Sequence, residues 1–165
     1  MRSVVADTSP LFYLLAIDHI DILPELFGTV MIPDAVRREL CHPAAPELVR
    51  EWVIALPVWA QISHGEPRGD PALRGLGSGE RAAIELALSM CADLLLIDER
   101  KGTQAAIAKG VHVTGTLGIL GAAARRGLVD LADSFKRLKR TNFRYRQEIL
   151  DELLAEHSRD GGSLE

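Results

Sequence analysis

The sequence is poor in cysteine and in aromatic residues. Two of its 165 residues are cysteine, and aromatic side chains make up 5% of the chain. Cys41 and Cys91 do not form a pair with metal-binding spacing, so we expect both to be small apolar side chains in or near the core of a protein from a reducing compartment. The first scarcity excludes a small domain held together by disulfide bonds. The second leaves few rings that can stack on nucleic-acid bases.

Long apolar segments are also absent. No stretch approaches the roughly 20 consecutive apolar residues that a membrane-spanning helix needs. The opening residues, MRSVVADTSP, reach the charged Asp7 before the apolar part of a secretory signal develops. With 47% hydrophobic and 25% charged residues, the composition is typical of a globular domain with a buried core. We therefore expect a cytoplasmic protein with no membrane contact.

Motifs for nucleotide cofactors and for transition metals are missing as well. The chain has no GxxxxGK[ST] loop, and in the segment GLGSGE Glu80 stands where a dinucleotide-binding motif requires a small residue. The five histidines show no metal-ligand spacing. The acidic residues are therefore the best candidates for chemistry.

The net charge of −4 disfavours a phosphate-rich partner for the chain as a whole, but the charges are unevenly distributed. Residues 100–146 hold 11 of the 19 basic side chains and only two acidic ones, so this segment carries +9 and the remainder −13. The segment is suited to bind anions. Its lysines and arginines are equally compatible with a solvated helix face.

Short apolar runs alternate with helical patterns along the chain. Strands are expected at residues 3–6, 28–32, 58–62, 93–97 and 111–114. Helices are expected at 10–17, 35–41, 45–55, 79–91, 115–127, 130–139 and 144–157, and another follows Asp98-Glu99 and ends at Lys109. Ser9, Asp34 and Ser78 are the expected caps of the first, second and fourth of these ranges. This alternation favours an α/β fold, a three-layer α/β/α sandwich around a central, mainly parallel sheet of four to five strands. We predict one domain over residues 1–157 and a disordered tail at 158–165, with a long loop at 63–78 that is either a lid or slack.

Four acidic residues are expected to converge at one edge of this sheet. Asp7 and Asp98 each follow an apolar strand directly, which places them at the carboxyl ends of strands, where open α/β sheets bind ligands. Glu39 lies on the helix after the second strand, and Glu80 lies in the first turn of the helix that leads into the Asp98 strand. Clustered carboxylates repel one another unless a cation offsets their charge, and oxygen ligands suit Mg²⁺ or Mn²⁺. Such an ion promotes the attack of water on a phosphodiester.

Each of these residues also has an ordinary structural explanation. Glu80 would stabilise a helix dipole by about 0.3–1 kcal/mol, and Glu39 would be a solvated helical residue. Glu99 is better suited to cap the next helix, and Asp98 to bind a ligand. Thr114 and Thr116 would either hydrogen-bond a carboxylate at this edge or cap the helix that follows them.

The sequence resembles the PIN-domain ribonucleases, most closely the VapC-like toxin branch. The resemblance is carried, in family order over residues 3–140, by VVADTSPLFYL, IPDAVRREL, GSGERAAIELA, DLLLIDERKG and VTGTLGILGAAARRG. It implies a PIN-like sandwich, an acidic pocket with Mg²⁺ or Mn²⁺, and metal-dependent endoribonuclease activity. It also implies a homodimer and a cognate antitoxin that covers the pocket.

Transferred residue by residue, the resemblance implies that the catalytic acids are Asp7, Glu39, Glu80 and Asp98. We expect Asp7 and Asp98 to hold the ion directly, and Glu80 and Glu39 to bind it directly or through water. The residues expected to support the site are Thr8, Ser9, Glu99, Thr114 and Thr116. Those expected to contact single-stranded RNA are Arg100, Lys101, Arg125 and Arg126. Two features depart from the family pattern: many relatives have Asp in place of Glu80, and many carry a further downstream acid, where this chain offers only Glu99 and the two threonines.

Two other functions are compatible with the pattern. Phosphatases of the haloacid-dehalogenase type also place an Asp after the first strand, but they need a second Asp two residues later, where Ser9 stands here. In a non-catalytic interaction module, the acids would cap helices and a groove would bind a partner helix.

Overall fold

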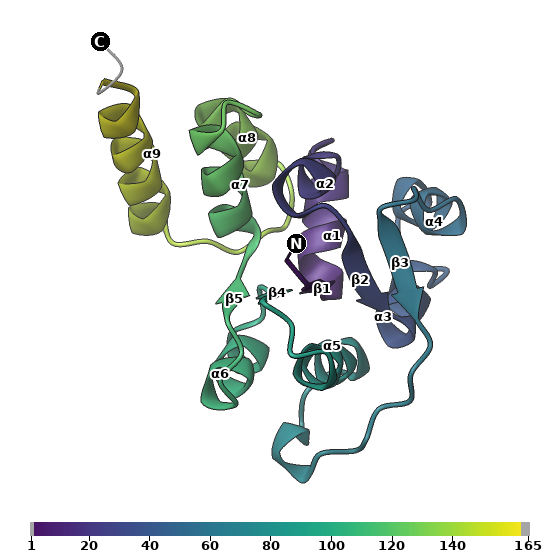
Figure 1. The fold of residues 1–165 in the computed structure, drawn as a ribbon. Coiled ribbons are helices and arrows are strands. Elements are labelled where there is room, and N and C mark those ends of the chain that lie inside the picture. The colour runs from purple at the N-terminus through teal and green to yellow at the C-terminus, as the bar shows by residue number, and fades with distance from the viewer. Residues whose placement is uncertain (1, 163–165) are drawn as a thin grey trace.

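The computed structural model describes residues 2–162, in which five short strands form one parallel sheet. The strands are β1 (Val4–Ala6), β2 (Val30–Pro33), β3 (Ala60–Ser63), β4 (Leu94–Leu96) and β5 (Val113–Thr114). Helices cover both faces of the sheet (Figure 1), which confirms the predicted three-layer α/β/α sandwich.

The strand order, β3-β2-β1-β4-β5, places β1 in the centre of the sheet. From β1 the chain first builds outward through β2 to β3, and it then returns to the other side of β1 to add β4 and β5. The connections therefore change direction between β1 and β4. In parallel α/β sheets such a switch point leaves a crevice beyond the carboxyl ends of the two strands.

The described residues contain nine α-helices, eight of them predicted from the sequence. They are α1 (Thr8–Ala16), α2 (Ile22–Phe27), α3 (Asp34–Leu40), α4 (Glu47–Ile54), α5 (Ser78–Ser89), α6 (Arg100–Ala108), α7 (Thr116–Arg125), α8 (Leu131–Lys139) and α9 (Gln147–Gly162). None of them is long and apolar enough to cross a membrane. The additional helix, α2, has six residues, too few to display a helical period in the sequence.

The two faces of the sheet are buried against different helices. Val4 and Ala6 of β1 belong to the larger core, which α1, α7 and α8 complete, whereas Val5 faces the smaller core formed with α5 and α6. Alternate residues of a strand point to opposite faces, so both faces of β1 must be apolar. This burial explains the uninterrupted apolar run that ends at Asp7.

Three helices begin earlier than their predicted caps imply. Asp7, Pro33 and Gly77 occupy the N-cap positions of α1, α3 and α5, and none of the three makes a side-chain capping hydrogen bond. The predictions of Ser9, Asp34 and Ser78 as caps are therefore wrong. At α5 the reason is visible, because a carboxylate from α3 binds a first-turn amide in place of a local cap.

The long loop after β3 is fastened to the helices beneath it. Glu85 of α5 accepts hydrogen bonds from the backbone amides of Arg68 and Asp70, at 2.8 and 3.0 Å, and Asp70 forms an ion pair with Lys109. A 3₁₀ turn, Pro71–Leu73, buries Leu73 completely. These contacts exclude the interpretation of the loop as slack.

Two further expectations need correction. Helix α9 continues to Gly162, so residues 158–162 are helical rather than disordered; the side chains of Ser158 and Arg159 donate to the carbonyls of Leu154 and Ala155, one turn earlier in the helix. Residues 163–165 lie outside the described part of the chain. Cys41 packs against the larger core as expected, but Cys91 is exposed because it follows α5 in a turn with φ of 49°.

Candidate active site

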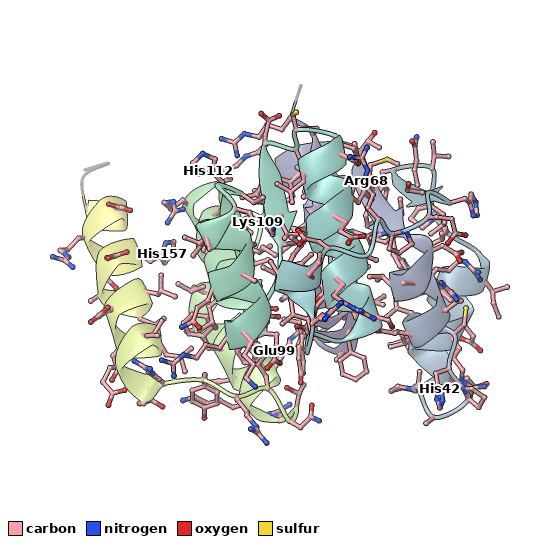
Figure 2. All side chains as sticks on the ribbon, turned by 90° about the horizontal axis from the view of Figure 1, so that it is seen from below. His42, Arg68, Glu99, Lys109, His112 and His157 are labelled. Atoms are coloured by element: carbon pink, nitrogen blue, oxygen red, sulfur yellow. The ribbon has the colours of Figure 1, made fainter. Side chains whose placement is uncertain are left out.

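Asp7 and Asp98 lie at the switch point between the two central strands. Asp7 follows β1 directly and is 3% exposed, and its backbone amide donates to the carbonyl of Leu96 in β4 at 2.9 Å. Asp98 stands two residues beyond the end of β4. In Figure 2, Glu99 marks this edge of the molecule, and His112 marks the opposite edge. The crevice that the topology predicts therefore contains two carboxylates.

Burial and neighbouring charges both disfavour the ionised form of Asp7. Burial is the larger effect, and with the repulsion from Glu80, Glu39 and Asp98 it raises the pKa of Asp7 to about 7, although the Thr8 amide acts in the opposite direction. The other three acids therefore lie within electrostatic reach of Asp7, and Glu39 lies within reach of Glu80. The structure thus brings together, at one edge of the sheet, the acids that are far apart in the sequence.

Asp98 is held in place by a single threonine. The Thr116 amide donates to one carboxylate oxygen and the Thr116 hydroxyl to the other, each at 2.7 Å, and Thr116 is fully buried. Burial raises the pKa of Asp98, and the negative charge of Glu99 raises it further, whereas the two hydrogen bonds from Thr116 lower it. A Cβ atom at Gly115 would lie 2.6 Å from Asp98 Oδ1, so this position requires glycine.

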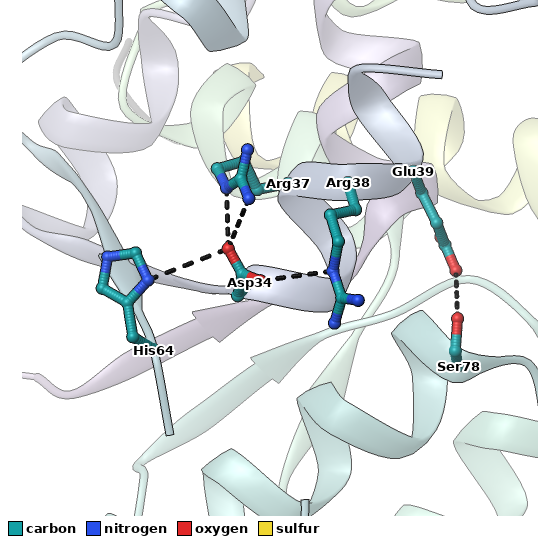
Figure 3. A network of polar contacts seen from close by, with 6 residues as sticks. All are labelled: Asp34, Arg37, Arg38, Glu39, His64 and Ser78. Atoms are coloured by element: carbon teal, nitrogen blue, oxygen red, sulfur yellow. Dashed lines mark hydrogen bonds and ion pairs between the residues drawn. The ribbon is translucent and has the colours of Figure 1, made fainter. Parts of the chain in front are cut away.

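Glu39, in the last turn of α3, connects the first turns of two other helices to its own helix. It accepts a short hydrogen bond from the Thr8 hydroxyl in α1, and from α5 it accepts the Gly79 amide at 2.9 Å and the Ser78 hydroxyl at 3.3 Å (Figure 3). A Cβ atom on Gly79 would lie 2.6 Å from Glu39 Oε2. The close approach of α3 and α5 therefore depends on this glycine.

Glu80 is half-buried in the first turn of α5 and faces α6. A Cβ atom at Gly102 in α6 would lie 3.0 Å from Glu80 Oε2, which shows how closely the two helices approach. The pKa of Glu80 is raised, mainly by burial and further by the charges of Glu99 and Glu39. Glu80 is thus a further member of the acidic cluster.

Asp34, the other acid on α3, differs from the four clustered acids because it has basic partners. Asp34 binds Arg37 at 2.7 Å and Arg38 at 3.2 Å, with His64 at 3.8 Å (Figure 3). The hydrogen bond from Arg37 is the main reason why the pKa of Asp34 is lowered. Among the ion pairs of the described residues, none involves any of the four clustered acids.

The supporting residues occupy different positions around the cluster. Ser9 is half-buried in the first turn of α1, and Thr114 ends β5, where its carbonyl accepts the Ile97 amide at 2.9 Å. Glu99 is exposed at the N-cap of α6, without a capping bond from its side chain. It affects the site through its charge, which acts on Glu80 and Asp98.

Two of the four predicted RNA-contacting residues lie near the acids. Arg100 and Lys101 are exposed at the beginning of α6, directly after Asp98 and Glu99. Arg125 and Arg126 lie at the far end of α7, roughly 14 Å along its axis from the end near Asp98. Arg126 donates to the carbonyl of Glu25 at 2.5 Å and so helps to fasten the segment around α2. The structure therefore does not bring this second pair to the site.

Comparison with known families agrees with this geometry. A family model described as a PIN domain matches residues 3–159. The chain belongs to the PIN-domain family. The match extends beyond the motifs at residues 3–140 that carry the resemblance in the sequence. PIN domains are typically nucleases, so a nuclease-type function follows for this member. No curated protein matches the chain.

PIN domains generally use divalent metal ions, and the donor chemistry of this PIN domain fits such an ion. Among the residues that the structure describes, no basic side chain forms an ion pair with the four carboxylates, and Asp7 is buried among them, so their charge is not compensated. Within residues 2–162, however, no three His, Cys, Asp or Glu side chains are already arranged to hold a metal. Glu39 illustrates this, since both of its carboxylate oxygens accept hydrogen bonds from the protein.

One residue of the PIN domain near the site was missed by sequence reasoning. Tyr13 of α1 donates to Asn142 Oδ1 at 3.0 Å; its pKa is raised first by burial and then by the charge of Asp98, while Arg144 lowers it. The segment LFYLL suggested only a core helix. The glycines at 79 and 115 did leave a signal, because each stands at or next to the start of a helix that carries a site residue.

Proposed function

We propose that this PIN domain is a metal-dependent endoribonuclease that cleaves phosphodiester bonds in single-stranded RNA. One observation carries the proposal: the buried Asp7 lies at the switch point of the sheet with three more carboxylates around it, and none of the ion pairs in the described part of the chain involves them. Such an arrangement costs free energy in the isolated protein, and a cation on which RNA phosphates also bind would offset that cost.

The residues that would hold Mg²⁺ or Mn²⁺ are Asp7, Asp98 and Glu80. A divalent cation bound there compensates the clustered negative charge and promotes the attack of water on a phosphodiester. Thr116 fixes the orientation of Asp98 through both carboxylate oxygens. Glu39 holds the first turn of α5, which carries Glu80, in place. Arg100 and Lys101 attract the RNA phosphates.

We further propose that the protein is the toxin of a toxin–antitoxin pair and acts as a homodimer. The support is the resemblance of its motifs to the VapC-like branch, over residues 3–140. A cognate antitoxin would cover the acidic pocket, so addition of this small protein should inhibit cleavage.

The decisive experiment compares the purified protein with its Asp7→Asn variant on end-labelled single-stranded RNA. We expect cleavage with Mn²⁺ or Mg²⁺, none in EDTA, and a loss on the order of 100-fold or more for Asp7→Asn, because the variant removes a charge that would bind the ion. Asp133→Asn is the matched control, since Asp133 is an exposed acid on α8. Full activity of Asp7→Asn would refute the site. Absence of cleavage by the wild type would favour a non-catalytic interaction module.

A further inference from the structure

A groove of about 720 Å³ adjoins the acidic cluster on the side of β5. Its walls come from the first turns of α6 and α7 and from residues 143–149, which lead into α9. Asp98 is the one acid among the residues that line it. The groove therefore begins at a site carboxylate and extends away from it.

The remaining lining of the groove includes three arginines and two aromatic residues. Arg100, Arg144 and Arg146 are exposed in its walls, and guanidinium groups bind phosphates through pairs of hydrogen bonds. Tyr145, between two of these arginines, is 38% exposed, and Phe143 is half-buried. Alternating cations and rings are the combination that binds single-stranded nucleic acid, because the cations contact the backbone and the rings stack on bases.

The segment that carries these side chains is anchored on α1. The Phe143 ring packs edge-on against Tyr13 with centroids 4.9 Å apart, and the Phe143 amide donates to the Thr141 hydroxyl at 3.1 Å. The Tyr13 hydroxyl bonds to Asn142. Since α1 begins directly after Asp7, the basic segment and Asp7 are positioned by the same helix.

We propose that this groove binds the single-stranded RNA adjoining the bond to be cut, with Tyr145 stacked on a base and Arg144 and Arg146 on the backbone. The proposal rests on the nuclease function and identifies the surface that selects its substrate. It also changes the expectation from composition: rings are scarce in the chain, but Phe143 and Tyr145 both lie in this groove.

The test measures RNA binding separately from cleavage, in the Asp7→Asn background, by fluorescence anisotropy of a labelled single strand. Tyr145→Ala should weaken binding about 5- to 150-fold, whereas Tyr145→Phe, which keeps the ring, should bind within about twofold of the parent. Arg146→Ala should reduce the dependence of log affinity on log salt by about 0.7, the contribution of one lost phosphate contact on a single strand. Arg2→Ala is the matched control, because Arg2 borders Asp93 and His112 at the opposite edge of the sheet.

The outcomes separate this proposal from the nuclease function. If the wild type cleaves RNA but Tyr145→Ala and Arg146→Ala bind like the Arg2→Ala control, the groove proposal is wrong and the nuclease function stands. If the wild type does not cleave RNA but Tyr145→Ala still weakens binding, the groove proposal survives and the nuclease function fails. If the groove variants change only self-association, measured by sedimentation, the groove is a protein contact and the proposal is wrong. Circular dichroism checks that each variant is folded.

Discussion

Asp7 and Asp34 occupy the same kind of position and differ completely in their surroundings. Each follows a strand directly at the same edge of the sheet. The pKa of Asp34 is lowered because Arg37 and Arg38 neutralise it, whereas the pKa of Asp7 is raised to about 7 by burial and by neighbouring acids. An acid after a strand is therefore a weak signal by itself. Its partners decide whether it stabilises the fold or is available for chemistry.

The raised pKa of Asp7 predicts how stability depends on pH when metal is removed. The Asp7 carboxyl binds its proton more tightly in the folded protein than in the unfolded chain, where its pKa is 3.8. The protonated carboxyl therefore makes its full contribution to stability below pH 3.8, and this contribution is lost as the pH rises to about 7. In EDTA the free energy of unfolding of Asp7→Asn should exceed that of the wild type increasingly over this range, by up to roughly 4 kcal/mol. Urea unfolding between pH 4 and 8 measures the difference, with Asp133→Asn as the control for a lost surface acid. A difference that is constant with pH would contradict the burial of an ionisable Asp7.

Some site residues were predictable from the sequence and others were not. Asp7 and Asp98 were found because a buried strand must end before a charge, and this rule needs no tertiary information. Tyr13 was missed because an aromatic residue on an apolar helix looks the same whether or not one of its edges faces a site. Arg125 and Arg126 were misplaced because the sequence does not show which end of α7 lies near the acids.

At the level of elements, Glu39 links the first turns of α1 and α5 to the last turn of α3 in a way that a helical pattern does not reveal. Its bonds to Thr8 and Gly79 fix α1 and α5 relative to α3. The five strands and eight of the nine helices of the described residues followed from apolar patterns, because burial requires those patterns. The exact starts of α1, α3 and α5 did not follow, and at α5 the reason is that the long-range bond from Gly79 to Glu39 replaces a local cap.

Gly79→Ala tests this link between helices. The new Cβ atom would lie 2.6 Å from Glu39 Oε2, so the carboxylate must move and lose its bonds to α1 and α5. We expect a modest loss of stability, about 1 kcal/mol, because the flexible end of Glu39 yields, together with a fall in cleavage of about tenfold. Thermal unfolding and cleavage rates on labelled RNA measure the two effects. Gly65→Ala is the control, because its Cβ atom would make only an ordinary contact, 3.8 Å from Ser63 Oγ. Equal behaviour of the two variants would show that Glu39 does not position the site.

At the level of the whole molecule, the strand order places the basic segment on one side of the sheet. The segment with a charge of +9, residues 100–146, forms α6, β5, α7 and α8 on the β5 side of the sheet, and the acids Asp7 and Glu39 come from the other half of the fold. The sequence showed the charge asymmetry and the alternation of strands and helices. It did not show that β4 is paired with β1, and this pairing is what brings Asp98 beside Asp7.

Divalent cations should stabilise the whole domain. An ion that binds only the folded state at about 100 times its dissociation constant adds about 2.7 kcal/mol, which raises the melting temperature of a chain of this size by roughly 8 °C. We expect this increase with Mn²⁺ for the wild type and for Asp133→Asn, and little or none for Asp7→Asn. Differential scanning fluorimetry with and without EDTA provides the measurement. An equal increase for Asp7→Asn would place the ion elsewhere.

The anchoring of residues 142–143 on Tyr13 has a consequence for the order in which the protein becomes complete during translation. All four acids have been synthesised once residue 98 has been added, but the threonine that fixes Asp98 follows only at position 116 and the second wall of the groove only at residues 143–149. A nascent chain on the ribosome, surrounded by messenger RNA, therefore carries the carboxylates well before the surface that we propose holds the strand. An early-terminated product that ends before residue 140 would possess every acid and yet lack the aromatic and basic wall of the groove, Phe143 to Arg146.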